Sequence, residues 1–139
     1  AAAPDRQFRT PVHDVTLAND GLVYVADRTN NRLQVFQKDG TFQTEAFVRP
    51  ATLGSGSVSA LVLSDDSEQR WLFIADGTNN VIWIVERQSL EVQSHFGRLG
   101  KNAGQFYRLH NLDIDSRGNL YTTEVNAGQR AQKFNRLSQ

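Results

Sequence analysis

The most constraining feature of the sequence is a segment that occurs three times at nearly equal spacing. The copies are VYVADRTNNRLQVF at 23–36, LFIADGTNNVIWIV at 72–85 and LYTTEVNAGQRAQKF at 120–134. An acidic residue anchors each copy, at Asp27, Asp76 and Glu124, with spacings of 49 and 48 residues. A repeat of this length is typical of stacked supersecondary units, each of which buries its apolar face only against its neighbours. The repeat therefore predicts the fold, and function is sought where the copies differ.

Each repeat predicts four short antiparallel strands. The first strand of each copy alternates apolar and polar residues, at 13–17, 58–62 and 110–114. A second strand ends at the acidic anchor, a polar turn such as 28–31 follows, and a third strand runs through an aromatic residue. Fourth strands are expected at 41–48 and 90–96. Four such strands without any helical periodicity describe a β-propeller blade, so the expected fold class is all-β.

We expect a single propeller segment of three blades, at about 8–50, about 51–98 and about 99–139, of which the third is incomplete. A blade has two apolar faces, so three blades in a row leave two end faces uncovered. Two copies joined head to tail would close a six-bladed ring, of which one chain is half. The alternative is that the chain is part of a longer polypeptide.

Composition excludes several classes of partner. Fifteen basic and fifteen acidic side chains cancel, so the usual electrostatic footprint of a nucleic-acid binder is missing. No apolar run approaches the roughly 18–20 residues that cross a bilayer, and we expect no membrane partner. The absence of Cys excludes disulfides and thiolate metal sites. The opening AAAP fits either the end left by signal cleavage or a cloning remnant; we favour the former, and hence a secreted or periplasmic protein.

The polar turns after the second strands are expected to be architectural. Asp27 and Asp76 can accept backbone N–H groups within the turn, and the asparagine pairs that follow tolerate left-handed backbone geometry. The turns resemble the NHL repeat over nearly the whole chain. The D-x-x-N-x-R pattern of that family is complete only in the first copy, where Arg32 ends it. The second copy has Val81 there, and the third has an extra residue before Arg130.

The histidines are more specific. His13 and His110 each open the first strand of a repeat, whereas the intervening repeat has Ala60 near that place. First strands line the channel of a propeller, so the two imidazoles should converge towards its axis and supply half of a zinc site. The alternative is that each histidine ends a strand and hydrogen-bonds locally. We expect His95, late in a fourth strand, to be an ordinary surface residue.

The segment 11–15, PVHDV, followed by VYVADR, resembles a blade of peptidyl-α-hydroxyglycine α-amidating lyase. That resemblance implies a six-bladed propeller enzyme that cleaves α-hydroxyglycine-extended peptides to a peptide amide and glyoxylate. It implies zinc held by three histidines from alternate blades, two of which match His13 and His110. It also implies a catalytic role for Arg28, directly after the V-A-D triplet, where the second repeat has Gly77.

In that role, zinc would polarise the substrate hydroxyl, and Arg28 would hold a carboxylate in a bidentate grip. The alternative for Arg28 is a salt bridge on the propeller face. The resemblance is incomplete, because a third zinc-binding histidine and further active-site residues would lie in blades that this sequence lacks. Arg108, two residues before His110, stands where the lyase has an apolar residue.

The sequence therefore predicts an NHL-type binding scaffold with an incomplete or vestigial metal site. The alternative is a zinc-dependent lyase that acts on peptidyl-α-hydroxyglycine when a six-bladed ring is assembled. The candidate ligand-binding residues on the loop face are Arg28, Asn30 and Arg32, for a peptide or small molecule. Calcium is a less favoured cofactor; Asp113 and Asp115 carry oxygens for it, but a solvated turn explains them as well.

Overall fold

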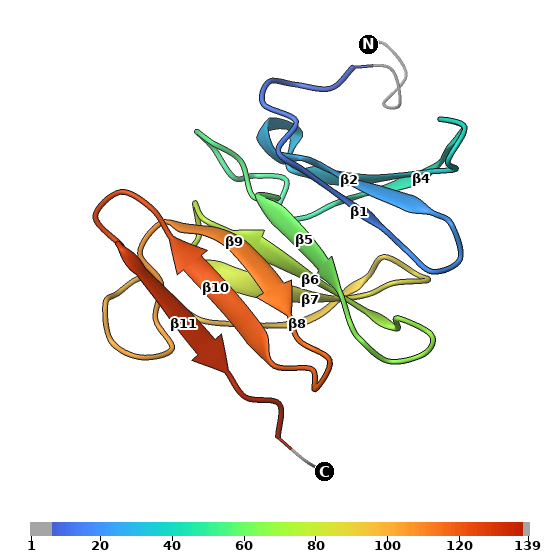
Figure 1. Ribbon diagram of the computed structural model, residues 1–139. Coiled ribbons are helices and arrows are strands. Elements are labelled where there is room, and N and C mark those ends of the chain that lie inside the picture. The colour runs from blue at the N-terminus through green and yellow to red at the C-terminus, as the bar shows by residue number, and fades with distance from the viewer. Residues whose placement is uncertain (1–6, 138–139) are drawn as a thin grey trace.

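The computed structural model describes residues 7–137 and contains three antiparallel sheets, arranged in chain order (Figure 1). The segment AAAP, on which the expectation of a cleaved signal rests, lies outside these residues. Among the described residues, regular helix is confined to a single 3₁₀ turn at Arg28–Asn30. None of them belongs to a helix long and apolar enough to cross a bilayer. The all-β prediction is confirmed.

The strands follow the predicted order within each repeat. The first sheet contains β1 (Asp14–Leu17), β2 (Val23–Asp27), β3 (Arg32–Phe36) and β4 (Phe42–Phe47). The second contains β5 (Ala60–Leu63), β6 (Trp71–Asp76), β7 (Val81–Glu86) and β8 (Val92–Phe96). The third contains β9 (Leu109–Ile114), β10 (Leu120–Glu124) and β11 (Arg130–Phe134). Strand order equals chain order in every sheet, and β5 packs between β1 and β9, so the first strands of the three repeats are neighbours.

Two apolar cores separate the three sheets. The core between the first and second sheets includes Tyr24, Leu33, Leu72, Ile74 and Val85, all buried. The core between the second and third sheets includes Ala75, Ile82, Leu109, Leu112 and Phe106. Alternate residues of the middle strands point into opposite cores, as the two-residue period of a strand requires. The second sheet is thus buried on both faces, as a blade inside a propeller would be.

An aromatic cluster joins the second and third sheets. Phe106, which is 0% exposed, lies with its ring centroid 6.3 Å from that of Phe96 and 5.6 Å from that of Phe134. Phe8, which precedes the first sheet, packs on Phe36 of β3 with ring centroids 6.0 Å apart but remains 44% exposed. Among the described residues, Phe8 has no second aromatic neighbour like Phe96, which packs on Phe106 from the preceding blade.

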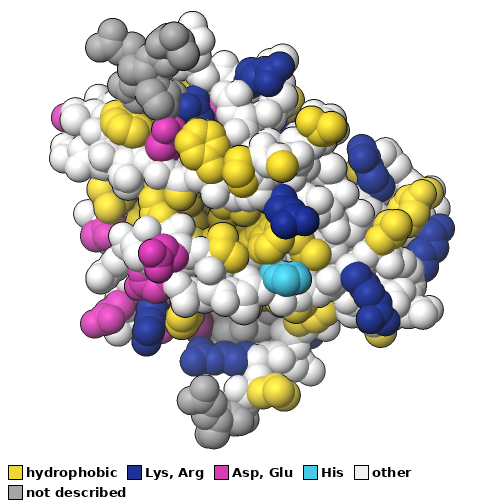
Figure 2. Space-filling model, turned by 180° about the vertical axis from the view of Figure 1, so that it is seen from behind, with side chains coloured by type: hydrophobic (Ala, Val, Ile, Leu, Met, Phe, Trp, Pro, Cys, Tyr) yellow, Lys and Arg dark blue, Asp and Glu magenta, His cyan; other side chains and the backbone are white. Residues whose placement is uncertain are grey.

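The two end faces differ in character. On the outer face of the first sheet, Val15 pairs with Val25 and Leu17 with Val23, and Val15 and Leu17 are 62% and 55% exposed. The space-filling view from behind also shows apolar side chains exposed in a band across the molecule (Figure 2). Apolar exposure of this kind is uncommon in a protein that works as a monomer.

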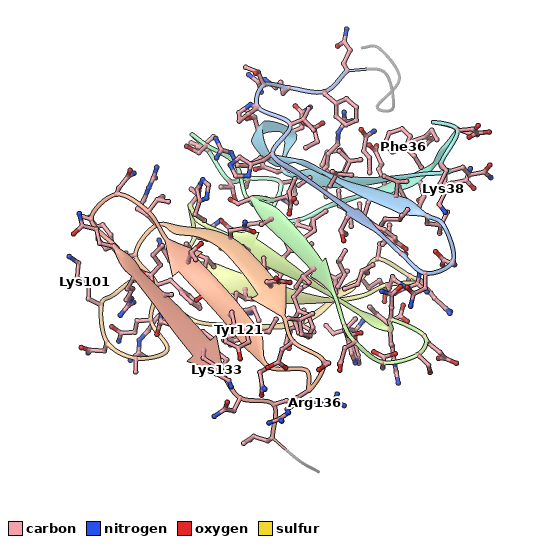
Figure 3. All side chains as sticks on the ribbon, viewed as in Figure 1. Phe36, Lys38, Lys101, Tyr121, Lys133 and Arg136 are labelled. Carbon is pink, nitrogen blue, oxygen red and sulfur yellow. The ribbon has the colours of Figure 1, made fainter. Side chains whose placement is uncertain are left out.

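The outer face of the third sheet is mainly polar. The exposed side chains on this face are Asn111, Asp113, Tyr121, Thr123, Ala131 and Lys133. Lys133 lies over the Tyr121 ring, with Nζ 5.3 Å from the centroid (Figure 3). The expectation of two apolar end faces is confirmed for the first sheet and wrong for the third.

Candidate functional site

The turn after β2 is held together by a buried carboxylate. Asp27 accepts hydrogen bonds from the Arg9 backbone N–H (3.1 Å), Asn30 Nδ2 (2.7 Å) and Arg32 Nε (2.6 Å). Arg32 is itself buried and forms a second ion pair with Glu45 (3.1 Å). Asn30 and Arg32, predicted to bind a ligand, are thus engaged within their own blade. Their contacts support the architectural interpretation of this turn.

The equivalent carboxylate of the second repeat is Asp76, which is surrounded by neutral donors. Asp76 accepts hydrogen bonds from the backbone N–H groups of Thr78 and Asn79, from Asn79 Nδ2 and from Trp83 Nε1. Val81 stands where the first repeat has Arg32, and within residues 7–137 no guanidinium pairs with this carboxylate. Burial raises the pKa of Asp76 above its ordinary value, against the lowering effect of these hydrogen bonds.

The second asparagine of each turn holds the next blade. Asn31 and Asn80 both have φ of 58°, so the predicted left-handed geometry is confirmed at these positions. Asn31 Oδ1 accepts a hydrogen bond from the Ser57 N–H (2.9 Å), and Asn80 Oδ1 accepts one from the Arg108 N–H (2.8 Å). Each amide therefore fixes the segment that leads into the next inner strand, and Asn80 positions Arg108.

The structure brings the two candidate metal ligands together. The ring centroids of His13 and His110 are 5.0 Å apart, and their planes meet at 71°. One ring comes from the first blade and the other from the third, so two residues 97 positions apart in the sequence lie in ring contact.

The strand register identifies the equivalent residue in the middle sheet. Asp14 lies opposite Ala26, Ala60 opposite Ala75 and Asn111 opposite Thr123, and each of these partners directly precedes an acidic anchor. The residues directly before Asp14, Ala60 and Asn111 are His13, Ser59 and His110. These three therefore occupy the same position in their repeats. The middle blade thus contributes Ser59, one residue before Ala60. The alternation of apolar and polar residues in the sequence does not show that Ser59 is the residue aligned with the two histidines.

Ser59 fixes the tautomer of His13. The Nδ1 atom of His13 lies 2.5 Å from the Ser59 carbonyl oxygen. Because a carbonyl oxygen can only accept, Nδ1 carries the proton, and Nε2 of the neutral ring keeps a lone pair. Burial lowers the pKa of His13, and the charges of Arg28 and His110 act in the same direction, against the Ser59 hydrogen bond and Asp14. The neutral ring that metals require is therefore favoured.

Asp14, next to His13, accepts two backbone hydrogen bonds. Its Oδ2 accepts a hydrogen bond from the Leu61 N–H (2.8 Å), and its Oδ1 accepts one from the Val15 N–H. Asp14 thus joins the inner strands of the first two sheets.

Arg28 lies at a small cavity beside the histidines. The cavity has a volume of about 30 Å³ and is lined by Arg28, Ser59, Gly77, Thr78, Arg108 and His110, among others. Within residues 7–137, Arg28 Nε is buried without a hydrogen-bond partner, and Arg28 forms no ion pair. Burial lowers the pKa of Arg28, and the charge of Arg108 adds to this effect. The salt bridge considered for Arg28 is not formed in this part of the chain.

The described residues contain no group of three or more His, Cys, Asp or Glu side chains placed to hold a metal ion. A zinc site at His13 and His110 would therefore need one or two further ligands from outside these residues.

The two candidate calcium ligands, Asp113 and Asp115, accept hydrogen bonds from neighbouring protein groups. Asp115 accepts hydrogen bonds from Asn119, Arg117 and Tyr121, and these hold its pKa well below its ordinary value. Asp113 accepts from the Ile114 N–H. These contacts are those of a turn and a strand, and they leave calcium binding at this position as a prediction.

Comparison with known proteins identifies the class of fold. Residues 12–36 match the family model of the NHL repeat. No curated protein sequence matches the chain. Virginiamycin B lyase from Staphylococcus aureus is 15% identical, with a TM-score of 0.63 over 96% of this chain and 43% of that one. A catalytically inactive histidine-to-alanine variant of that lyase, solved with quinupristin, is 14% identical, with a TM-score of 0.61 over 96% and 45%.

The RRP9 WD40 repeats are 17% identical, with a TM-score of 0.63 over 85% of this chain and 34% of that one. The chain spans less than half the length of these solved structures. At this level of identity they establish the fold. The chain is a segment of a β-propeller, and its first blade carries an NHL repeat.

The contacts of Arg32 generate a stability prediction. Arg32→Leu should lower the free energy of unfolding by about 3–5 kcal/mol, because it leaves the buried Asp27 carboxylate without its cation. The measurement is urea denaturation followed by circular dichroism. The matched control is Arg136→Leu, whose exposed pair with Asp65 spans 3.6 Å and should contribute less than about 1 kcal/mol. Equal losses in both variants would contradict an architectural role for Arg32.

Proposed function

We propose that this propeller segment is a binding scaffold whose channel end carries an incomplete metal site. The observation that carries the proposal is the His13–His110 ring pair, 5.0 Å between centroids. It is supported by the Ser59 carbonyl, which leaves Nε2 of His13 available as a donor. Two imidazoles suit zinc, and the remaining ligands would come from outside the described residues.

The residues around the pair define what the site can do. His13 and His110 would hold the ion through ring nitrogens, and Ser59 orients the His13 ring. Zinc, when bound, supplies Lewis-acid polarisation of an oxygen. Arg28 contributes a positive charge on the same cavity as His110. The positive charge of Arg28 repels a metal dication, so the site is better suited to a metal ion that binds together with an anionic ligand.

The second candidate is a zinc-dependent lyase that cleaves the C–N bond of peptidyl-α-hydroxyglycine, giving a peptide amide and glyoxylate. The convergence of both histidines, with Arg28 on the cavity that His110 lines, favours it. The solved variant of the S. aureus lyase also shows that loss of a histidine inactivates that propeller. The described residues hold no third ligand, so this activity requires an assembled ring.

Zinc binding tests the site directly. His13→Ala and His110→Ala should each weaken zinc affinity by more than about tenfold, because each removes one of two imidazole donors. The measurement is isothermal titration of chelator-treated protein with zinc chloride, with cobalt absorption as a second readout. His95→Ala is the matched control, since His95 lies exposed on β8.

Equal affinity in the wild type and all three variants would overturn the metal site. Release of glyoxylate from an α-hydroxyglycine peptide by zinc-loaded protein, lost in His110→Ala, would favour the lyase over the scaffold.

We further propose that another blade covers the outer face of the first sheet. The exposed Val15 and Leu17, together with Phe8, support this assignment. The blade would come from a second copy or from the rest of a longer polypeptide. A head-to-tail ring of two copies would also need the polar outer face of the third sheet, which complements an apolar face less well.

Self-association separates these possibilities. Leu17→Asp should weaken association of copies at least about tenfold, because it buries a carboxylate in an apolar contact. Thr123→Asp, on the polar face, should leave association unchanged. The measurement is sedimentation velocity over a concentration series. Equal disruption by both variants would favour the head-to-tail ring, and a wild-type monomer would favour a blade from a longer polypeptide.

A further inference from the structure

Charge is distributed unevenly between the two ends of the sheets, although the net charge of the chain is zero. One end, which we call the histidine end, holds His13 and His110, the turns after β2, β6 and β10, and the connections between blades. Its described segments are 7–13, 28–31, 48–59, 77–80, 97–108 and 125–129. These segments contain no acidic residue and six Lys or Arg residues, namely Arg9, Arg28, Arg49, Arg98, Lys101 and Arg108.

The cations of the histidine end are not neutralised within residues 7–137. All of them except the half-buried Arg28 are exposed, and none of the six forms an ion pair in this part of the chain. The carboxylates that end β2, β6 and β10 are buried. Lys101 projects away from the sheets at this end (Figure 3). Exposed cations of one sign on one surface create a positive potential that attracts anionic partners.

The opposite end of the sheets has a different charge pattern. Each of the turns 18–22, 37–41, 64–70, 87–91 and 115–119 contains at least one acidic residue. Cations of this end are also paired, Arg87 with Asp20 at 2.6 Å and Arg136 with Asp65 at 3.6 Å. In Figure 2 the acidic side chains lie in the left half of the view, whereas basic side chains also extend over the right half. The zero net charge therefore results from two ends of different sign.

Two exposed leucines stand among the cations of the histidine end. Leu53 is 85% exposed in the connection between the first two blades, four residues after Arg49. Leu99 is 64% exposed in the next connection, directly after Arg98 and two residues before Lys101. Neither leucine lines the small cavity beside His110. This surface therefore presents apolar side chains next to unpaired positive charges.

We propose that the histidine end docks onto an anionic membrane surface, with Leu53 and Leu99 entering the headgroup region. Anionic headgroups attract Lys and Arg, and apolar side chains partition into the boundary between headgroups and acyl chains. A single-stranded nucleic acid would match the charge, but it binds by stacking its bases on aromatic side chains, which leucine does not provide. The expectation of no membrane partner considered spanning segments, and a surface contact needs none. Docking of this kind goes beyond the proposed binding function and requires no metal.

The experiment is co-sedimentation of EDTA-treated protein with vesicles of phosphatidylcholine, with and without phosphatidylserine. The protein should bind the anionic vesicles alone, and raising the salt concentration from about 0.1 M to about 1 M should release it, because salt screens exposed charges. Arg98→Gln/Lys101→Gln should lower the partition coefficient at least about tenfold, since each substitution removes a cation from the contact. The matched control is Lys38→Gln/Arg117→Gln, which removes two exposed cations of the opposite end and should bind as the wild type does.

The leucine contact has a matched control in Leu137, which is also 85% exposed but lies after β11, at the opposite end. Leu53→Ser should weaken binding to anionic vesicles about threefold or more, because it removes an inserted apolar side chain, and Leu137→Ser should not. The chain has no Cys, so Leu53→Cys and Leu137→Cys can each carry a single environment-sensitive fluorophore. Anionic vesicles should shift the emission of the first label to the blue and leave the second unchanged.

Three results would overturn the proposal: no preference for anionic over neutral vesicles, equal losses in the two pairs of charge variants, or no blue shift of the Leu53→Cys label on bound vesicles. Vesicle binding that is equal in Leu53→Ser and Leu137→Ser would also overturn it, because attraction by charge alone would favour a soluble polyanion such as RNA. If a variant fails to fold, the lipid and salt comparisons of the wild type still decide.

Discussion

The fold depends on one buried carboxylate at the end of each second strand. Asp27, Asp76 and Glu124 are buried, and a buried charge is tolerated only where donors surround it. Asp27 and Glu124 each accept a backbone N–H from the segment entering their blade, at Arg9 and Tyr107. The carboxylate therefore joins two parts of the chain that the sheet hydrogen bonds alone leave unconnected.

The three blades surround this buried carboxylate with different donors, and we expect functional residues where the repeats differ in this way. Arg32 and Arg130 neutralise the first and third carboxylates, whereas the second accepts from Trp83 and its own turn. Because Arg32 is used in this way, Arg28 is the cation of that turn which is free of an ion pair within residues 7–137. In the second blade Gly77 takes the place of Arg28, since a Cβ there would lie 2.1 Å from the Leu109 carbonyl oxygen. The third blade approaches so closely at this point that no side chain fits.

Most of the fold was predictable from the sequence, because the same pattern of strand and turn residues occurs three times. Period-two alternation and turn residues located the strands, and matched position alone indicated that His13 and His110 would meet. The partners of Asn30 and Arg32 were less accessible, because a polar residue in a turn looks the same whether it faces a ligand or a buried carboxylate. The polar outer face of the third sheet also went unpredicted, since face assignment needs the register, and a shift of one residue exchanges the faces.

The charges near the His13–His110 pair bear on the proposed metal site and on the lyase alternative. Two imidazoles would attract a metal cation, while the guanidinium groups of Arg28 and Arg108 repel it. Within residues 7–137 the proposed metal site has too few ligands, and the two arginines form no ion pair. A ligand that carries a carboxylate and a second oxygen would resolve both, because its charge pairs with the arginines and its oxygen can complete the coordination of a metal.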